Sequence, residues 1–79
     1  MDRMKKFVRM LDARLRRRVE QAAEQIIQGN LERLDIKPMK GYDRLFRCRI
    51  GSVRITFQRL DNGRNILLDA AFCGSAYKK

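Results

Sequence analysis

Three arginines in the middle of the chain have the side-chain type and spacing to act on a phosphate group. Arg47, Arg49 and Arg54 alternate with apolar residues on either side of Gly51-Ser52. This pattern predicts a β-hairpin with that dipeptide as its two-residue turn, because glycine adopts a positive φ without steric cost. A guanidinium donates several N–H groups in a planar fork that suits phosphate oxygens. Such a cluster can hold a nucleic-acid backbone or stabilise the charge of a phosphorane-like transition state.

The register of this hairpin separates an apolar face from a basic one. Pairing outward from the turn sets Arg49 opposite Arg54, and Arg47 opposite Thr56. Like charges placed opposite each other destabilise a sheet, so stability alone does not explain why Arg49 faces Arg54. An anionic ligand that binds both arginines explains this pairing. The alternative is a solvated sheet face on which Asp69 neutralises part of the charge. The other face carries the apolar side chains Phe46, Cys48, Ile50, Val53, Ile55 and Phe57.

A second hairpin is predicted at Asp61-Asn62-Gly63-Arg64, since Asn-Gly is a strong signal for a tight turn. Pairing outward from a two-residue turn sets Phe57 opposite Leu68. By the same register, Ile55 lies opposite Ala70 and Val53 opposite Phe72. The third strand therefore extends the apolar face of the first hairpin.

Two helices precede the sheet. Apolar residues recur at helical spacing over residues 4–11 and again over residues 15–27, where Asp12 is the expected N-cap and Gly29-Asn30 the end. The run Arg16-Arg17-Arg18 reads most simply as a solvated helix face. Residues 31–42 are predicted to be an ordered connection, because Pro38 interrupts hydrogen bonding. The result is one α+β domain over residues 1–79, α-α-β-β-β, with a helical hairpin on a three-stranded antiparallel sheet.

Composition narrows the partners and the chemistry. The 79 residues carry a net charge of +10, which favours nucleic acid, an acidic protein or an anionic membrane surface. No apolar run approaches the roughly 20 residues that cross a bilayer, and no secretory signal follows the basic start, so we expect a soluble, cytoplasmic protein that does not bind a membrane.

The chain has no histidine, no glycine-rich phosphate loop and no carboxylate cluster, so neither a metal nor another cofactor is expected. We interpret Cys48 and Cys73 as buried thiols on strands, because two cysteines alone do not complete a zinc site.

The segment from Leu34 to Phe57 resembles the middle of the RelE/ParE superfamily of bacterial toxins. It contains K-P-M-K-G followed by L-F-R-C-R-I-G-S-V-R-I-T-F, where the superfamily has K-P-L-K-G and L-[YF]-R-x-R-[VI]-G-x-x-R-[IV]-x-[YF]; the match covers about residues 12–70. The resemblance implies a small sheet on a helical hairpin and an acidic antitoxin partner. RelE-like members cleave messenger RNA on the ribosome without a metal, and ParE-like members inhibit DNA gyrase.

The resemblance also assigns residues. Arg47 and Arg49 match paired basic positions on a strand, Arg54 matches an arginine of the catalytic surface, and Tyr77 matches a C-terminal tyrosine. These four are therefore the expected catalytic residues of an mRNA endonuclease. The expected nucleic-acid-binding residues are Lys37, Lys40, Lys78 and Lys79.

Two departures from the superfamily leave alternatives open. Residues 71–76 lack the basic run that usually precedes the terminal tyrosine, which favours a protein that binds gyrase, antitoxin or nucleic acid without cleavage. A basic RNA-binding module unrelated to toxins is the other alternative. The usual strand before the first helix is also absent, so we expect unpaired sheet edges at the strand with Phe46, Cys48 and Ile50 and at the strand with Ile66, Leu68 and Phe72. These edges predict a homodimer joined through the sheet.

Overall fold

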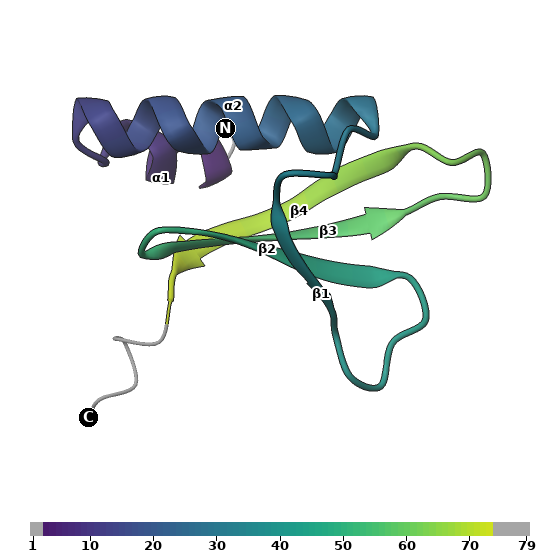
Figure 1. The fold of residues 1–79 in the computed structure, drawn as a ribbon. Coiled ribbons are helices and arrows are strands. Elements are labelled where there is room, and N and C mark those ends of the chain that lie inside the picture. Colours follow the sequence, from purple (N-terminus) through teal and green to yellow (C-terminus); the bar gives the residue numbers. More distant parts are fainter. Residues whose placement is uncertain (1–2, 74–79) are drawn as a thin grey trace.

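The computed structural model describes residues 3–73 and has the predicted α+β fold, with both helices on one face of an antiparallel sheet (Figure 1). The strand order is β1-β2-β3-β4, so each strand pairs with its neighbour in sequence. The sheet has four strands where the sequence predicted three. The elements are α1 (Arg3–Arg9), α2 (Ala13–Gln28), β1 (Asp35–Pro38), β2 (Leu45–Ile50), β3 (Val53–Arg59) and β4 (Asn65–Phe72).

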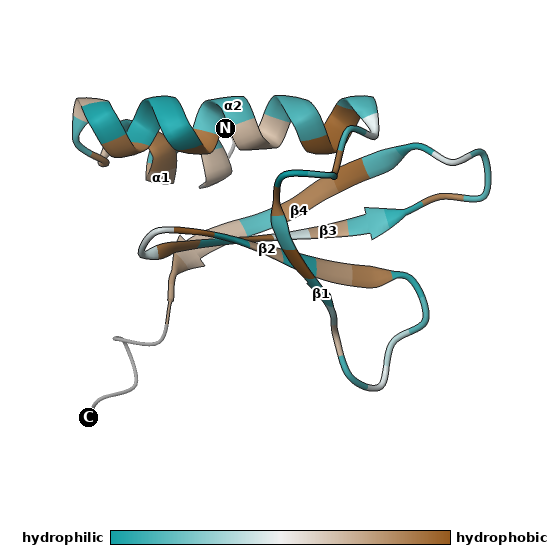
Figure 2. Cartoon of the chain, viewed as in Figure 1, coloured by the Kyte–Doolittle hydropathy of each residue, from teal (hydrophilic) through white to brown (hydrophobic). Residues whose placement is uncertain are grey.

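The long helix α2 begins and ends at the predicted residues. The Asp12 carboxylate accepts a hydrogen bond from the Leu15 N–H at 2.8 Å, which satisfies one of the free donors of the first turn. At the other end Gly29 has φ = 83°, and the Asn30 N–H donates to the Gln25 carbonyl at 2.8 Å. Apolar residues of α2 gather on the side toward the sheet and polar ones on the outer side (Figure 2).

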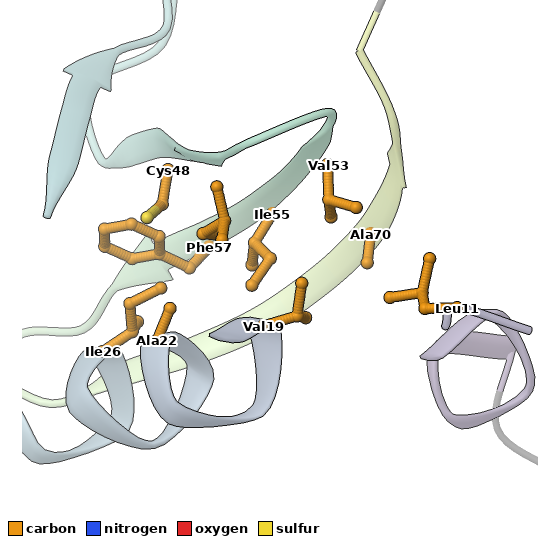
Figure 3. Close-up of a cluster of buried hydrophobic side chains, with 10 residues drawn as sticks. Leu11, Val19, Ala22, Ile26, Cys48, Val53, Ile55, Phe57 and Ala70 are labelled. Atoms are coloured by element: carbon orange, nitrogen blue, oxygen red, sulfur yellow. The ribbon is translucent and has the colours of Figure 1, made fainter. Parts of the chain in front are cut away.

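The core lies between α2 and the predicted apolar face of the sheet (Figure 3). Phe57 and Ile26 are fully buried, and the rings of Phe57 and Phe46 stack with centroids 5.6 Å apart. The other buried apolar residues are Leu11, Val19, Ala22, Cys48, Ile50, Val53, Ile55 and Ala70. Since one face of the central strands fills this core, their alternate residues must face the opposite side.

The β2–β3 hairpin has the predicted register throughout. Arg49 lies opposite Arg54, and Arg47 opposite Thr56. Gly51 has φ = 59° in the two-residue turn, as the pattern required. The basic face predicted from the sequence is therefore present.

The β3–β4 hairpin differs from the prediction at its turn. The Leu60 N–H donates to the Arg64 carbonyl at 2.7 Å, so the loop contains three residues rather than two. Phe57 consequently pairs with Leu67, not with Leu68 as predicted. A β-bulge then absorbs one residue of β4, and the pairs formed by Ile55 and Val53 are those predicted. The bulge leaves the Leu68 side chain 45% exposed.

Replacement of Gly63 tests this three-residue loop. Gly63 has φ = 85°, a backbone conformation that costs an L-residue about 1–2 kcal/mol, and no atom lies within 4 Å of where a Cβ would be. We expect Gly63→Ala to lower the free energy of unfolding by about 1 kcal/mol through backbone strain alone. Urea denaturation measures the change, and Gly63→Asn should lose less, because asparagine tolerates this conformation better. Equal stability of the wild type and Gly63→Ala would show that the loop relaxes.

The predicted connection over residues 31–42 was wrong in one part, since it contains β1. Asp35 pairs with Arg49, and Lys37 with Arg47, in an antiparallel ladder. Pro38 does not prevent this pairing because β1 is an edge strand, where a missing N–H can face away from the sheet. The edge predicted at β2 is therefore covered, and the free edges among the described residues are β1 and β4.

Candidate nucleic-acid interface

A pocket of about 190 Å³ lies on the sheet face opposite the helices. We call it the arginine pocket; its lining residues are Asp35, Lys37, Arg47, Arg49, Arg54 and Cys73. Two of the arginines come from β2 and the third from β3, while β1 supplies the aspartate and the lysine. The three arginines predicted to be catalytic thus share one pocket with one of the predicted binding lysines.

Strand pairing fixes the order of charges across this pocket. Lys37 lies opposite Arg47, and Asp35 opposite Arg49, which in turn faces Arg54. Residues directly opposite on an antiparallel pair have Cβ atoms about 5 Å apart, so these charges are close neighbours. Strand pairing therefore brings four cationic side chains and one carboxylate together in this pocket.

The three arginines of the pocket are not held in ion pairs within residues 3–73. In the part of the chain that the structure describes, no carboxylate lies within ion-pair distance of Arg47, Arg49 or Arg54. Asp69, the predicted neutralising residue, lies opposite Thr56 as the register required. The Arg54 side chain is half-buried, whereas those of Arg47 and Arg49 are exposed. A set of adjacent cations with free N–H donors attracts an anion with several oxygens.

The remaining predicted site residues divide into two groups. Lys40 lies outside the arginine pocket but lines an adjoining hollow with Pro38, Met39 and Arg47. Tyr77, Lys78 and Lys79 lie outside the described residues. Their roles stay predictions.

Asp35 and Cys73 were missed as pocket residues. Asp35 was assigned to a connection, although Asp35-Ile36-Lys37 has the polar–apolar alternation of a strand. Cys73 was predicted to be a buried strand thiol, but it follows the end of β4 and is only half-buried. Its backbone N–H donates to the Ser52 carbonyl at 2.7 Å, which holds it beside the turn between the arginine strands.

The buried thiol of Cys48 belongs to the core and confirms the other half of that prediction. Burial, with a smaller contribution from the negative charge of Asp35, raises the pKa of Cys48 from 9.0 to about 11. The folded thiol therefore stays protonated between pH 9 and 11, where an unfolded one ionises. By linkage, this difference lowers stability as the pH rises through that window.

Thiol alkylation tests the different environments of the two cysteines. With iodoacetamide at neutral to mildly basic pH, we expect Cys73 to be modified in the folded protein and Cys48 to react only on unfolding, because the thiolate is the nucleophile and Cys48 is shielded and protonated. Mass spectrometry of proteolytic peptides, with and without denaturant, measures both sites. Equal rates at the two cysteines in the folded protein would contradict the buried position of Cys48.

Residues 3–73 contain no group of three or more histidine, cysteine, aspartate or glutamate side chains arranged to hold a metal ion. In that same range, no helix combines the length and apolar character needed to cross a membrane.

Comparison with solved structures finds a protein of the same architecture. A chain of the RelB–RelE antitoxin–toxin complex from Methanococcus jannaschii matches 98% of this chain and 92% of its own, with a TM-score of 0.75 and 23% sequence identity. The fold is that of a toxin–antitoxin complex chain. No protein-family model and no curated protein matches the sequence. At 23% identity the similarity to the RelB–RelE chain shows a shared fold alone, and the feature of this chain that bears on activity is the arginine pocket.

Proposed function

We propose that the protein is the toxin of a type II toxin–antitoxin system and a ribosome-dependent mRNA endonuclease that needs no metal. The observation that carries the proposal is the arginine pocket, where three guanidinium groups converge without an ion pair among the described residues. The fold shared with a chain of an antitoxin–toxin complex supports the cellular context. The resemblance in the segment from Leu34 to Phe57 supports the roles of the individual arginines.

The proposed reaction is an internal transfer at one phosphate of the RNA. The ribose 2′-oxygen attacks the adjacent phosphorus and the bond to the 5′-oxygen breaks, which leaves a 2′,3′-cyclic phosphate and a 5′-hydroxyl. Negative charge builds on the phosphoryl oxygens in the transition state, and fixed guanidinium donors stabilise it more than they stabilise the substrate. Arg54 is the most enclosed of the three and is proposed to contact these oxygens, with Arg47 and Arg49 beside it.

The proton balance of this reaction needs an acceptor and a donor. Arginine does not accept a proton at neutral pH, because its guanidinium group already carries its full set of protons. Asp35 supplies a carboxylate to the pocket and is proposed to accept the 2′-hydroxyl proton. Solvent water is proposed to donate the proton that the leaving 5′-oxygen takes up. Tyr77 is proposed to stack on the RNA or to polarise a reacting group, and Lys37, Lys40, Lys78 and Lys79 to hold flanking phosphates.

A toxin that acts without cleavage is the second candidate. The sequence Ala71 to Ala76 has no basic side chain before Tyr77, so a group that could protonate the leaving oxygen is missing from that stretch. Such a protein would use the same basic face to bind DNA gyrase, another target, or antitoxin and nucleic acid only.

Induced expression separates the two candidates. We expect growth and protein synthesis to slow together, with transcripts cut at ribosome-bound positions, while plasmid supercoiling stays unchanged. Co-expression of a short acidic protein from a neighbouring reading frame should restore growth if that protein is the antitoxin. Continued translation with altered supercoiling would instead assign the gyrase-inhibiting role.

Self-association is proposed through β4, the free edge that carries exposed apolar side chains. Ile66, Leu68 and Phe72 are 42%, 45% and 41% exposed, and an unprotected edge strand favours pairing with another strand. Sedimentation equilibrium in high salt, which screens the repulsion between chains of charge +10, measures the mass. A mass of 9.4 kDa at all concentrations would show a monomer and rule out the homodimer. The edge of β4 would then be proposed as a binding surface for the antitoxin.

A further inference from the structure

Three hollows that share lining residues, together called the basic track, follow one another around the edge strand β1. The arginine pocket shares Asp35 and Arg49 with a second hollow of about 270 Å³, here called the helix-side hollow, to which α2 and the α2–β1 connection contribute Arg18 and Arg33. At the other end, the arginine pocket shares Arg47 with the hollow lined by Lys40. The track therefore runs from α2, over β1 and β2, to the β1–β2 connection.

Local contacts place the two outer arginines. A Cβ added to Gly51 would lie 3.3 Å from Nη1 of Arg18, so this guanidinium sits over the turn that joins the arginine strands. Arg33 lies in a tight turn in which the Leu34 N–H donates to the Leu31 carbonyl at 3.1 Å. Arg16, from the same arginine run, lines a different hollow beside α1. Arg16 and Arg18 therefore lie on different surfaces, and Arg18 lines the hollow next to the arginine pocket.

We propose that single-stranded RNA follows this track, and that Arg18 and Arg33 form a second phosphate-binding site across β1 from the arginine pocket. The inference rests on the proposed function in taking RNA as the ligand of the arginine pocket. It adds residues that neither the sequence pattern nor the proposed reaction assigned. A bound strand would have its reacting phosphate over Arg54 and its next segment over the helix-side hollow.

The side chains along the track fit an RNA backbone better than a protein segment. Among the described residues, no aromatic side chain lines any of the three hollows, and Cys73 is the one uncharged residue that lines the arginine pocket. The residues that anchor protein–protein interfaces are most often tryptophan, tyrosine and arginine, and of these three the described lining supplies arginine alone. β1 is also a poor template for an added strand, because Pro38 has no N–H. The predicted binding along the track therefore depends mainly on charge and tolerates any base sequence.

Fluorescence anisotropy with RNA that resists cleavage tests the second site independently of catalysis. The probes are fluorescein-labelled 2′-O-methyl oligoribonucleotides of about 4 and about 12 nucleotides, short and long relative to known single-strand sites. The test variant is Arg18→Gln/Arg33→Gln. The matched control, Arg17→Gln/Arg64→Gln, removes the same charge from two exposed residues that line none of the three hollows. Circular dichroism confirms that both variants are folded.

We expect the test variant to bind the long RNA about tenfold more weakly, with the slope of log affinity against log salt reduced by about 1.4, since each lost phosphate contact removes about 0.7. Its affinity for the short RNA, and the affinity of the control for either RNA, should change less than about twofold. Equal losses in the two variants would overturn the second site, even if ribosome-dependent cleavage is present. Tighter binding of polyglutamate than of RNA, with the same dependence on Arg18 and Arg33, would assign the track to an acidic protein instead.

Discussion

Arg54→Ala is expected to lower the rate of mRNA cleavage on ribosomes about 100-fold, since removal of one preorganised donor to a developing oxyanion costs about two to three orders of magnitude. Arg54 is half-buried, faces Arg49 across the hairpin, and lines the arginine pocket. Its exposed neighbours are held less firmly, so we expect Arg47→Ala and Arg49→Ala to lose less. Single-turnover cleavage of a labelled message on purified ribosomes measures each rate.

The control for this prediction is Arg64→Ala. Arg64 is exposed in the β3–β4 loop and carries the same charge, so its loss reports the general effect of net charge on ribosome binding. We expect a change of less than about threefold, as for a charge that acts only at long range. If Arg54→Ala cleaves at a rate similar to Arg64→Ala, the arginine pocket is not the catalytic site.

Phe57→Ala is expected to lower the free energy of unfolding by about 3–5 kcal/mol, the usual cost of emptying a buried phenylalanine site. Phe57 has no exposed surface, stacks on Phe46 and lies between Cys48 and Ile26 in the core shown in Figure 3. Small domains are commonly stable by only a few kcal/mol, so a large part of the variant should be unfolded without denaturant. Urea titration followed by circular dichroism measures the loss.

Leu68→Ala is the matched test of the β-bulge. The bulge leaves Leu68 45% exposed, whereas the register predicted from the sequence would have placed it in the core opposite Phe57. We expect its removal to change the free energy of unfolding by about 0.5 kcal/mol or less. A loss as large as that of Phe57→Ala would restore the predicted register and refute the bulge.

The β2–β3 hairpin could be predicted to the residue because its information is local. Alternation fixes which side chains share a face, and Gly51-Ser52 fixes the turn, so the register follows from a few adjacent residues. The β3–β4 turn was mispredicted because Asn-Gly also fits a three-residue loop with glycine in the left-handed conformation. A β-bulge farther along β4 returns the pairing to the predicted register, and no residue type in that part of β4 predicted the bulge.

Strand β1 was missed for a different reason. Its four residues end at Pro38, and they become a strand only through pairing with β2, a contact that local propensity does not report. Because β1 was missed, the sequence placed Arg47, Arg49, Arg54 and Lys37 among the candidate site residues but left out Asp35, which lines the same pocket. Arg18 and Arg33 join the basic track through tertiary packing alone, so their proposed role could be recognised only from the structure.

The most direct test of the central proposal is cleavage of a defined messenger RNA by the purified protein, with 5′-end mapping, in the presence and absence of ribosomes. The proposal predicts cuts within the ribosome-bound codon, 5′-hydroxyl ends on the downstream fragments, and no cleavage of the free message. An intact message on ribosomes, from protein shown to be folded by circular dichroism, would contradict the endonuclease and favour a toxin that acts by binding.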